Sequence, residues 1–470
     1  MYRSRWMDGL KSKPSLRIDG ETTPLIPDLE RSTGPTVSSN PGLFAHHIPN
    51  NFHPRSPSMS PGGVSKIFFG ADAPTDLQSL KNFFCSSYVN VLLVAVPLSF
   101  ASHFLHWGSM ADFIISFIAI VPLAGLLGEA TEQVALKVGS TLGGLLNATF
   151  GNAVEAIVGL VALSQNQLRI VQTSMLGSIL SNILLVLGCS FIAAGFKFKE
   201  SRFQATAAQA SASLMLLACI ALVIPAAYFS SSLEKINSGR QHPAVPSGQD
   251  LAHGLALGIH AVAHEQSGKE LAQHGLLVIS RGTSVLLLAM YILYLYFQLS
   301  THSYLYEDTS TESEEEEAKM NFRTATGALI GVTVVTAFCA EYLVDSIDEF
   351  AQQAGIPKAF IGLILLPIVG NAAEHVTAVF MAMKGKMELA IGVAVGSSIQ
   401  IAVGVIPIMV IIGWATGKEL TLFFENFETI CLVFSVLLTT LLIQDGKSNY
   451  MEGAMLVSLY VIIGLAFWVS

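Results

Sequence analysis

From residue 83 to the end, the chain consists of apolar stretches of about 20 residues separated by short polar segments. A helix of about 20 residues crosses the ~30 Å hydrocarbon core of a bilayer. Backbone groups in lipid must be hydrogen-bonded within their own segment, which favours helices over open sheets. The predicted spans are residues 83–103, 110–131, 142–165, 170–195, 204–228, 276–299, 322–343, 358–383, 387–412, 425–443 and 450–469. The sequence therefore predicts an all-α polytopic membrane protein with about eleven transmembrane helices.

The charge content agrees with this class and excludes others. Only 13% of the residues are charged, against about 25% in a typical soluble domain. The net charge of −9 argues against a nucleic-acid partner, because such proteins present a basic surface. The sequence contains no Walker A, G-x-S-x-G or G-x-G-D motif. We therefore predict neither an enzyme nor a bound cofactor, and membrane lipid as the surroundings.

Residues 1–82 differ from the rest of the chain. They hold ten of the 18 prolines, many serines and charges of both signs. This composition cannot bury enough apolar surface to offset chain entropy, so we predict a disordered cytosolic tail. Within the tail, the string from Glu21 to Ile26 resembles the acidic dileucine signals read by sorting adaptors. A chance match of six residues is the alternative to a sorting signal.

The lysines and arginines of the short connections predict the orientation. Cytosolic loops are enriched in Lys and Arg. With the N-terminus in the cytosol, the cytosolic side carries Lys137, Lys197, Lys199, Arg202, Lys319, Arg323, Lys384, Lys386 and Lys447. The opposite side carries Arg169, Lys418 and the three basic residues of a longer insert, 229–275. The C-terminus is then predicted to be lumenal.

Two polar segments between the spans have more than one interpretation. The lumenal insert 229–275 carries His242, His253, His260, His264 and His274. It is read as an exposed loop, as a metal sensor because two of its histidines stand at i and i+4, or as a pH-responsive loop. The cytosolic linker 301–321 carries the acidic residues Glu312, Glu314, Glu315, Glu316 and Glu317. It is read as a solvated linker or as a collar that concentrates cations at a pore mouth.

An internal duplication organises the spans. The string GNAVE at 151–155 matches GNAAE at 370–374, and the same offset of 219 residues places Gly143 on Gly362. Each copy contains five spans, an odd number, so the second copy enters the membrane from the opposite side. Inverted repeats are typical of alternating-access carriers. We predict an extra first helix in 83–108, a first repeat in 109–300 and a second repeat in 322–470.

The repeated motifs supply the candidate site. Carboxylates, amides, hydroxyls and glycines recur at helical spacing in both copies, so they are expected to converge from four helices. The candidate ion- and proton-binding residues are Gly151, Asn152, Glu155, Ser178, Ser181 and Asn182 from the first copy, and Gly370, Asn371, Glu374, His375, Ser397 and Gln400 from the second. Among them His375 has two readings, as a proton participant or as a residue that orients its neighbours.

The chemistry of this set points to a hard cation. Oxygen ligands without thiolates suit Ca²⁺, which accepts six to eight oxygens in flexible geometry. Glu155 and Glu374 are the predicted metal ligands, and together they neutralise one Ca²⁺. Without the metal, two neighbouring carboxylates in a low dielectric cannot both remain ionised, so protons are expected to replace it. The alternative is that the two glutamates only join helices. Intramembrane carboxylates are, however, costly and usually functional.

Further acidic residues lie near the ends of the second and seventh spans. Glu129 and Asp345 are candidates for a cytosolic vestibule, together with Glu132 and Glu341. Pairing with lysines of the loops is the alternative for all four.

The motifs resemble those of the cation/proton exchanger branch of the calcium/cation antiporter superfamily. GNAVE and GNAAEH, followed by GSILSN and GSSIQIA, match its two duplicated repeat motifs over about residues 83–470. The resemblance implies a vacuolar Ca²⁺/H⁺ antiporter in which Glu155 and Glu374 alternate between Ca²⁺ and protons. It further implies that Asn152, Asn371, Ser181 and Gln400 line the ion or proton routes. The His-bearing insert and the long N-terminal tail depart from the family pattern.

The expected function is therefore exchange of cytosolic Ca²⁺ for lumenal H⁺ across the membrane of an acidic organelle. Two alternatives remain at this point. One is a Na⁺-coupled or other divalent-cation exchanger on the same scaffold, and the other is a cation channel. The sequence also leaves open whether the chain forms a homo-oligomer.

Overall fold

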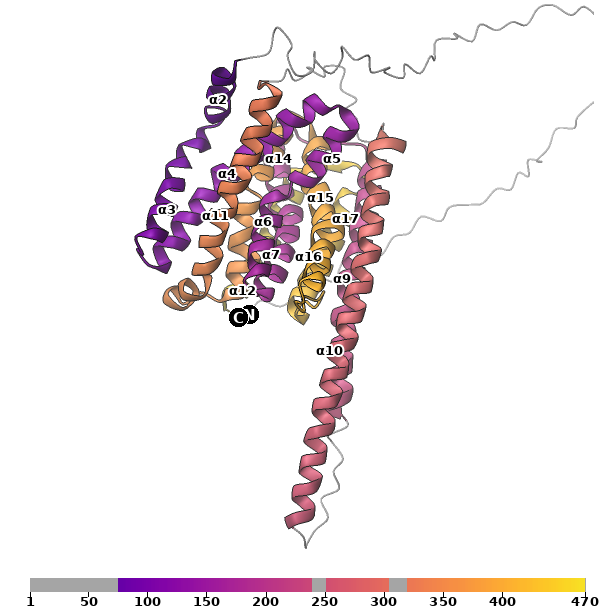
Figure 1. The fold of residues 1–470 in the computed structure, drawn as a ribbon. Coiled ribbons are helices and arrows are strands. Elements are labelled where there is room, and N and C mark those ends of the chain that lie inside the picture. The colour runs from indigo at the N-terminus through magenta and orange to yellow at the C-terminus, as the bar shows by residue number, and fades with distance from the viewer. Residues whose placement is uncertain (1–74, 239–250, 304–318, 470) are drawn as a thin grey trace, which may run out of the picture. The chain divides into compact units, whose positions relative to one another are not determined.

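The computed structural model describes residues 75–238, 251–303 and 319–469. Eight helices in these ranges are long and apolar enough to cross a membrane, and the number rises to 11 if each of three bent helix pairs forms one span. Within the described ranges, the strands are limited to one antiparallel pair, β1 (Ser201–Arg202) with β2 (Lys447–Ser448). The predicted all-helical membrane fold is confirmed (Figure 1).

The helices follow the predicted order of one extra span and two five-span repeats. The extra span comprises α2 (Asp76–Phe84), η1 (Tyr88–Val94) and α3 (Ala95–Phe104). The first repeat comprises α4 (Ser109–Val138), α5 (Ser140–Phe150), α6 (Ala153–Ser164), α7 (Leu168–Leu180), η2 (Ser181–Val186), α8 (Leu187–Gly195), α9 (Ala205–Ser238), α10 (Leu251–Tyr296) and η4 (Phe297–Thr301). The second comprises α11 (Phe322–Ala354), α12 (Lys358–Phe360), η6 (Ile361–Leu365), α13 (Leu366–Gly370), α14 (Ala372–Met383), α15 (Met387–Gln400), η7 (Ile401–Val405), α16 (Ile406–Ala415), α17 (Asn426–Ile443) and α18 (Tyr450–Val469).

The two repeats share two interruptions at equivalent places. The second span of each repeat bends at its Gly-Asn pair, by 48° between α5 and α6 and by 56° between the α12–α13 segment and α14. The third span of each repeat contains a π-helical segment, η2 in one and η7 in the other. These breaks place α6 and α14 with their N-terminal turns inside the protein, and each first turn carries a glutamate. A helix N-terminus with free N–H groups favours negative charge.

The connections define two opposite faces of the bundle. Face 1, at the top of Figure 1, has the loops at 196–204, 384–386 and 444–449. Face 2 has the turns at 165–167, 355–357 and 416–425. Contacts within each face agree with this assignment. On face 1 β1 pairs with β2, and on face 2 the Lys418 ammonium donates to the carbonyl oxygens of Leu163 and Ser164.

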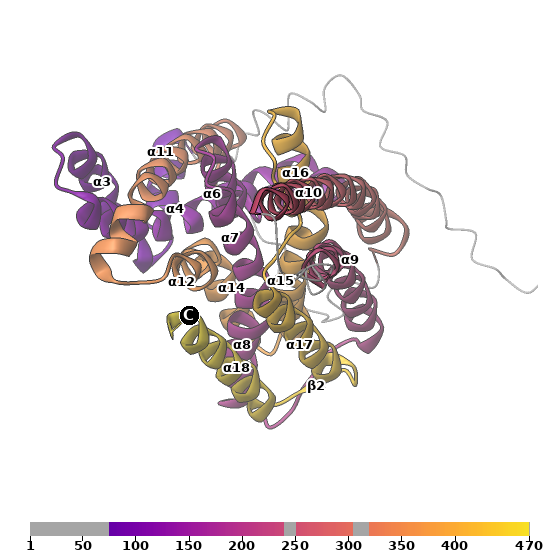
Figure 2. The same cartoon turned by 90° about the horizontal axis from the view of Figure 1, so that it is seen from below.

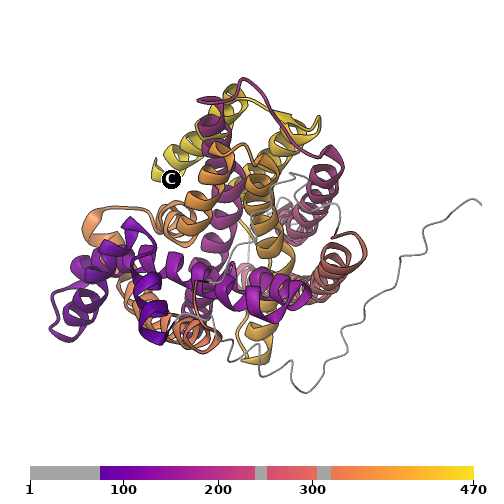
Figure 3. The same cartoon turned by 90° about the horizontal axis from the view of Figure 1, so that it is seen from above.

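Helices α3, α4 and α11 form a group at one side of the bundle, as Figures 2 and 3 show from its two ends. Helix α11 packs along α4 more extensively than any other two helices pack together. Toward face 2, the rings of Phe113 and Phe350 stack with their centroids 3.8 Å apart. Toward face 1, Gln133 Oε1 accepts hydrogen bonds from the backbone N–H groups of Lys319 and Met320. We call α4 and α11 the paired helices, and the other helices of the two repeats the core.

The centre of the core is a close crossing between α7 and the η6–α13 segment. A Cβ at Gly177 would lie 2.2 Å from the carbonyl oxygen of Leu363 and 2.6 Å from Pro367 Cγ. A Cβ at Gly362 would lie 2.0 Å from Thr173 Oγ1. Small residues let membrane helices approach closely, and here they bring a helix of each repeat into backbone contact.

Two segments differ from the sequence prediction. The first span, expected over 83–103, corresponds to η1–α3, and α2 precedes it as a helix at 94°. Because α2 begins at Asp76, residues 76–82, which were predicted to belong to the disordered tail, are helical. The insert 229–275, for which a plain loop was one reading, is largely helical, because α9 continues to Ser238 and α10 begins at Leu251. The insert is rich in Ala, Leu, Glu and Gln, which favour helices. Both helices extend beyond face 2 (Figure 1).

Candidate functional site

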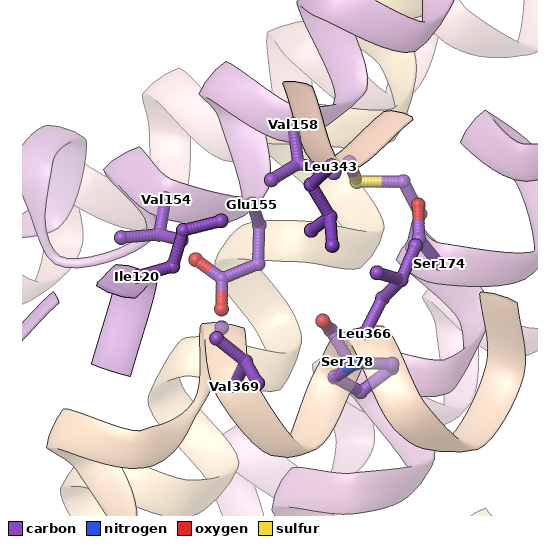
Figure 4. Close-up of a pocket in the computed structure, with 12 residues that line it drawn as sticks. Ile120, Val154, Glu155, Val158, Ser174, Ser178, Leu343, Leu366 and Val369 are labelled. Carbon is purple, nitrogen blue, oxygen red and sulfur yellow. The ribbon is translucent and has the colours of Figure 1, made fainter. Parts of the chain in front are cut away.

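A buried cavity lies between the paired helices and the core. Its volume is ≈ 20 Å³, which is room for about one water molecule or one monatomic ion. The lining comes from α4, α6, α7, α11 and α13 and consists of Ile120, Val154, Glu155, Val158, Ser174, Met175, Ser178, Leu343, Leu366, Pro367, Val369 and Gly370. Figure 4 shows the Glu155 carboxylate reaching toward Val369 at one side, with Ser174 and Ser178 at the other.

Glu155 is the main polar group of this cavity. The residue is 5% exposed, and neither of its carboxylate oxygens has a hydrogen-bond partner in another described residue. A Cβ at Gly370 would lie 2.7 Å from Glu155 Oε1, so a larger residue there would displace the carboxylate from its present position. A buried ionised group without partners is very costly. A carboxylate in this position would be stabilised by a proton or a cation.

The asparagines of the two Gly-Asn motifs are buried in the interior. Asn152 Nδ2 donates to Gln400 Oε1 at 2.7 Å, and Asn152 Oδ1 accepts from Ser397 Oγ at 2.5 Å. This network joins α6 of the first repeat to α15 of the second. Asn371 occupies the equivalent position in the second repeat, and its Nδ2 donates to the carbonyl oxygen of Ser178 at 3.1 Å. Each Gly-Asn motif is therefore hydrogen-bonded to the third span of the other repeat.

Glu374 lies one turn beyond Asn371 on α14. It is half-buried, and its Oε2 is shielded from solvent without a hydrogen-bond partner among the described residues. Its carboxylate is close enough to Glu155 for the two charges to repel each other. Asn371 Oδ1 is likewise buried and unpartnered in the described part of the chain. Among the buried side-chain atoms without a hydrogen-bond partner in the described ranges, four belong to Glu155, Asn371 and Glu374, whereas others, such as those of Thr326 and Ser448, lie elsewhere.

The remaining candidates of the repeat motifs lie at the edge of this group. Asn182 is fully buried at the start of η2, and both of its amide atoms lack partners in the described ranges. Ser181, also buried, lies beside the Tyr460 hydroxyl of α18. His375 is half-buried next to Glu374. Both of its readings, proton participant and orienting residue, stay predictions.

The vestibule candidates lie apart from the cavity. Glu129 is half-buried on α4 beside Ser86, whereas Asp345 and Glu341 are exposed on α11. Their proposed role stays a prediction. Glu21–Ile26 and Glu312–Glu317 lie outside the described residues, as do the side chains of His253, His260 and His264 and the whole of His242.

Two features were not predicted from the sequence. One is Ser174 in the cavity wall, and the other is a cluster of ion pairs on face 2. Ser174 stands four residues before Ser178 on the same helix face, and that spacing could have identified it. On face 2, Arg169 makes ion pairs with Glu428, which is fully buried, and with Glu425. The latter two residues also cap the start of α17 reciprocally. No local motif in the sequence indicates this pairing, because Arg169 and Glu428 are 259 positions apart.

The donor set fits a transient cation better than a permanently bound one. In the described ranges, no three His, Cys, Asp or Glu side chains gather to hold a metal ion. The cavity offers the carboxylate of Glu155 and the hydroxyls of Ser174 and Ser178, and the Glu374 carboxylate and the Asn371 amide oxygen lie in the adjoining motif. Such hard oxygen donors suit Ca²⁺, with water molecules completing the coordination.

Comparisons with known proteins support the same assignment. Residues 108–300 and 324–469 match the family described as "Sodium/calcium exchanger protein". The chain is 42% identical over 389 residues to the "Vacuolar calcium ion transporter" of Schizosaccharomyces pombe, covering 83% of this chain and 86% of that protein. It is 40% identical to the "Vacuolar cation/proton exchanger 2" of Oryza sativa subsp. japonica, covering 84% of each. The solved structure "Structure of native YfkE" superposes with a TM-score of 0.63 at 34% identity, over 81% of this chain and 100% of that one. The chain therefore belongs to the sodium/calcium exchanger protein family, in its cation/proton exchanger branch.

Proposed function

We propose that the protein is a secondary active antiporter that exchanges cytosolic Ca²⁺ for lumenal H⁺ across the membrane of a vacuole or another acidic organelle. The observation that carries the proposal is the pair Glu155 and Glu374. Glu155 is buried and Glu374 half-buried at equivalent places of the two repeats, and three of their four carboxylate oxygens are shielded from solvent without a hydrogen-bond partner among the described residues. Relatives named as vacuolar calcium transporters and Ca²⁺/H⁺ antiporters support it.

Competition at the two carboxylates would couple the ions. Two ionised glutamates compensate one Ca²⁺, and their mutual repulsion in a low dielectric requires protons when the cation leaves. The same groups then bind either Ca²⁺ or protons, which is the requirement for exchange. Each pH unit of gradient supplies about 1.4 kcal/mol per proton. More than one proton per Ca²⁺ is therefore needed for a steep Ca²⁺ gradient.

The distribution of basic residues supports face 1 as the cytosolic side. Lys137, the 197–202 segment, Lys384, Lys386 and Lys447 all lie at face 1. On face 2, Arg169 is paired with Glu428, and Lys418 is bound to helix carbonyl oxygens. Cytosolic loops are the ones enriched in basic residues. This orientation gives a cytosolic N-terminus and a lumenal C-terminus.

Alternating access would arise from movement of the paired helices against the core. The cavity has Ile120 of α4 and Leu343 of α11 as one wall, and core residues as the other. A small displacement of that apolar wall would open the cavity to one face or the other. The clamp of Arg169, Glu425 and Glu428 keeps the core elements together during the movement.

Reconstitution in proteoliposomes tests the proposal. With an imposed pH gradient, acid inside, ⁴⁵Ca²⁺ uptake is expected, and a proton uncoupler is expected to abolish it. Glu155→Gln and Glu374→Gln should each reduce uptake by at least about tenfold, since one lost ion–carboxylate contact costs more than 1.4 kcal/mol. Glu200→Gln is the matched control, because this glutamate lies exposed in a face 1 loop.

The outcomes separate the alternatives. Wild-type uptake by both Glu155→Gln and Glu374→Gln would refute the role of the two glutamates. Uptake that needs Na⁺ and ignores the uncoupler would identify a Na⁺-coupled exchanger. Electrical currents far above carrier rates, without a counter-ion, would identify a channel.

A further inference from the structure

Three polar residues on face 2 meet where the paired helices contact the core. Asp348 near the end of α11 forms an ion pair with Lys358, Oδ1 to Nζ 2.7 Å. Its Oδ2 accepts a hydrogen bond from Gln167 Nε2 at 3.3 Å. Asp348 belongs to the paired helices, whereas Lys358 begins α12 and Gln167 precedes α7, both in the core. These contacts therefore join the two bodies whose relative movement the proposed function requires.

Each of the three residues stands at the face 2 end of an element that lines the cavity. Asp348 stands five positions after Leu343, a distance of about 7.5 Å along α11. The segment that starts at Lys358 continues to Pro367, and the helix after Gln167 carries Ser174. The two contacts of Asp348 thus join three elements of the cavity wall, between the cavity and face 2.

The strength of these contacts suits a reversible closure. The side chains of Asp348 and Lys358 are 42% and 49% exposed, although Asp348 Oδ1 itself is shielded from solvent. Half-exposed ion pairs are weak. By contrast, the clamp on the neighbouring turn joins Arg169 to a glutamate with no exposed surface. The strong pair lies within the core, and the weak one crosses the boundary that has to open.

We propose that Asp348, Lys358 and Gln167 form a latch that holds the cavity closed toward face 2, and that releasing it sets the share of time the protein is open to that side. The three are positioning residues, since none of them touches the cavity. This inference rests on the alternating access of the proposed function and adds the residues that bias it.

The rate at which a cysteine in the cavity is labelled from each face tests the latch directly. Ser174→Cys is introduced after the five native cysteines are replaced, and sealed proteoliposomes receive a small membrane-impermeant methanethiosulfonate from one side at a time. Asp348→Asn or Lys358→Met is expected to raise the labelling rate from face 2 by about 2- to 5-fold, the range for a half-exposed ion pair. Labelling from face 1 should fall.

Charge exchange and a matched control complete the design. The double variant Asp348→Lys with Lys358→Asp should return the face 2 rate toward that of the parent, which a merely structural loss would not do. Lys447→Met removes a comparable exposed pair with Glu200, at 3.4 Å on face 1, and should leave both rates unchanged. Gln167→Leu removes only the neutral contact and should give a smaller increase.

Unchanged face 2 labelling in both single variants, or no recovery in the double variant, overturns the latch. Labelling needs no transported ion. A protein whose labelling responds as expected while Ca²⁺ uptake ignores the pH gradient would therefore refute the proposed function and leave the latch standing.

Discussion

The two repeats share their motifs but use them differently. Gly177 and Gly396 are equivalent by the 219-residue offset, yet a Cβ at Gly177 would collide with the backbone of Leu363, whereas a Cβ at Gly396 would meet nothing within 4 Å. Asn152 makes two side-chain hydrogen bonds to the other repeat, and Asn371 makes one to a backbone carbonyl. Glu155 lines the cavity and Glu374 does not. One sequence pattern thus serves two local environments.

This asymmetry shows what a single state of an inverted-repeat carrier looks like. If both repeats had identical contacts, the bundle would be symmetric about the membrane plane and open to both faces or to neither. Unequal contacts at equivalent positions therefore specify one side. Substitutions at equivalent positions should have unequal effects, which gives a direct way to test the comparison.

The largest difference is expected between Gly177→Ala and Gly396→Ala. A methyl group at Gly177 must displace the Leu363 carbonyl or Pro367, and overpacking of this kind costs about 1–3 kcal/mol or more. A methyl group at Gly396 has free space, and alanine favours the helix by up to ~1 kcal/mol. Apparent melting temperatures in detergent should fall for Gly177→Ala and stay level or rise for Gly396→Ala. Equal melting temperatures would mean that the close crossing is not specific to α7.

An intermediate difference is expected between Asn152→Ala and Asn371→Ala. The first substitution leaves both Gln400 and Ser397 without their partner, and each unsatisfied buried polar group costs about 1–3 kcal/mol. The second frees only the carbonyl oxygen of Ser178. Thermal unfolding should therefore show the greater loss for Asn152→Ala. The reverse order would refute the hydrogen-bonding asymmetry of the two motifs.

The smallest effect is expected at face 1, where β1 of the first repeat pairs with β2 of the second. Hydrogen bonds from Arg202 and Lys447 hold the pKa of Glu200 below its ordinary value of 4.5. A lowered folded-state pKa adds stability above the ordinary value and loses it as the pH falls through the folded-state value. At pH 6 the wild type should therefore unfold at a slightly higher temperature than Glu200→Gln. At pH 3 the difference between the two unfolding temperatures should disappear. A gap that persists at pH 3 would show that the carboxylate charge is not its cause.

The spans and the site motifs could be predicted because lipid leaves few alternatives. A stretch of about 20 apolar residues must be helical, and costly polar groups inside it must serve a purpose, which is how GNAVE and GNAAE stood out. The ends of the spans were less accessible. Helices α9 and α10 continue into a polar insert. The apolar stretch ends there, so hydropathy no longer indicates a helix, although the backbone remains helical.

The contacts that close the structure could not be predicted. Asp348 and Gln167 are 181 positions apart, and Arg169 and Glu428 are 259 apart. Nothing in the local sequence of either residue encodes its partner, because these pairs depend on how the repeats are oriented. The same holds for Gly177. Its contact with Leu363 depends on the depth at which α7 crosses η6. The equivalent Gly396 is also followed by a serine, Ser397 against Ser178, yet it has no such contact.

The unsatisfied oxygens of Glu155 have a consequence for the energetics of the whole fold. Whatever completes their bonding stabilises the folded chain as well, by RT ln(1 + [L]/Kd) for a ligand L. The occupancy of this position by a ligand and the free energy of unfolding are therefore thermodynamically linked. The least stable form of the protein is the one with two ionised glutamates and neither cation nor proton, and a transport cycle that always exchanges one occupant for the other never has to populate it.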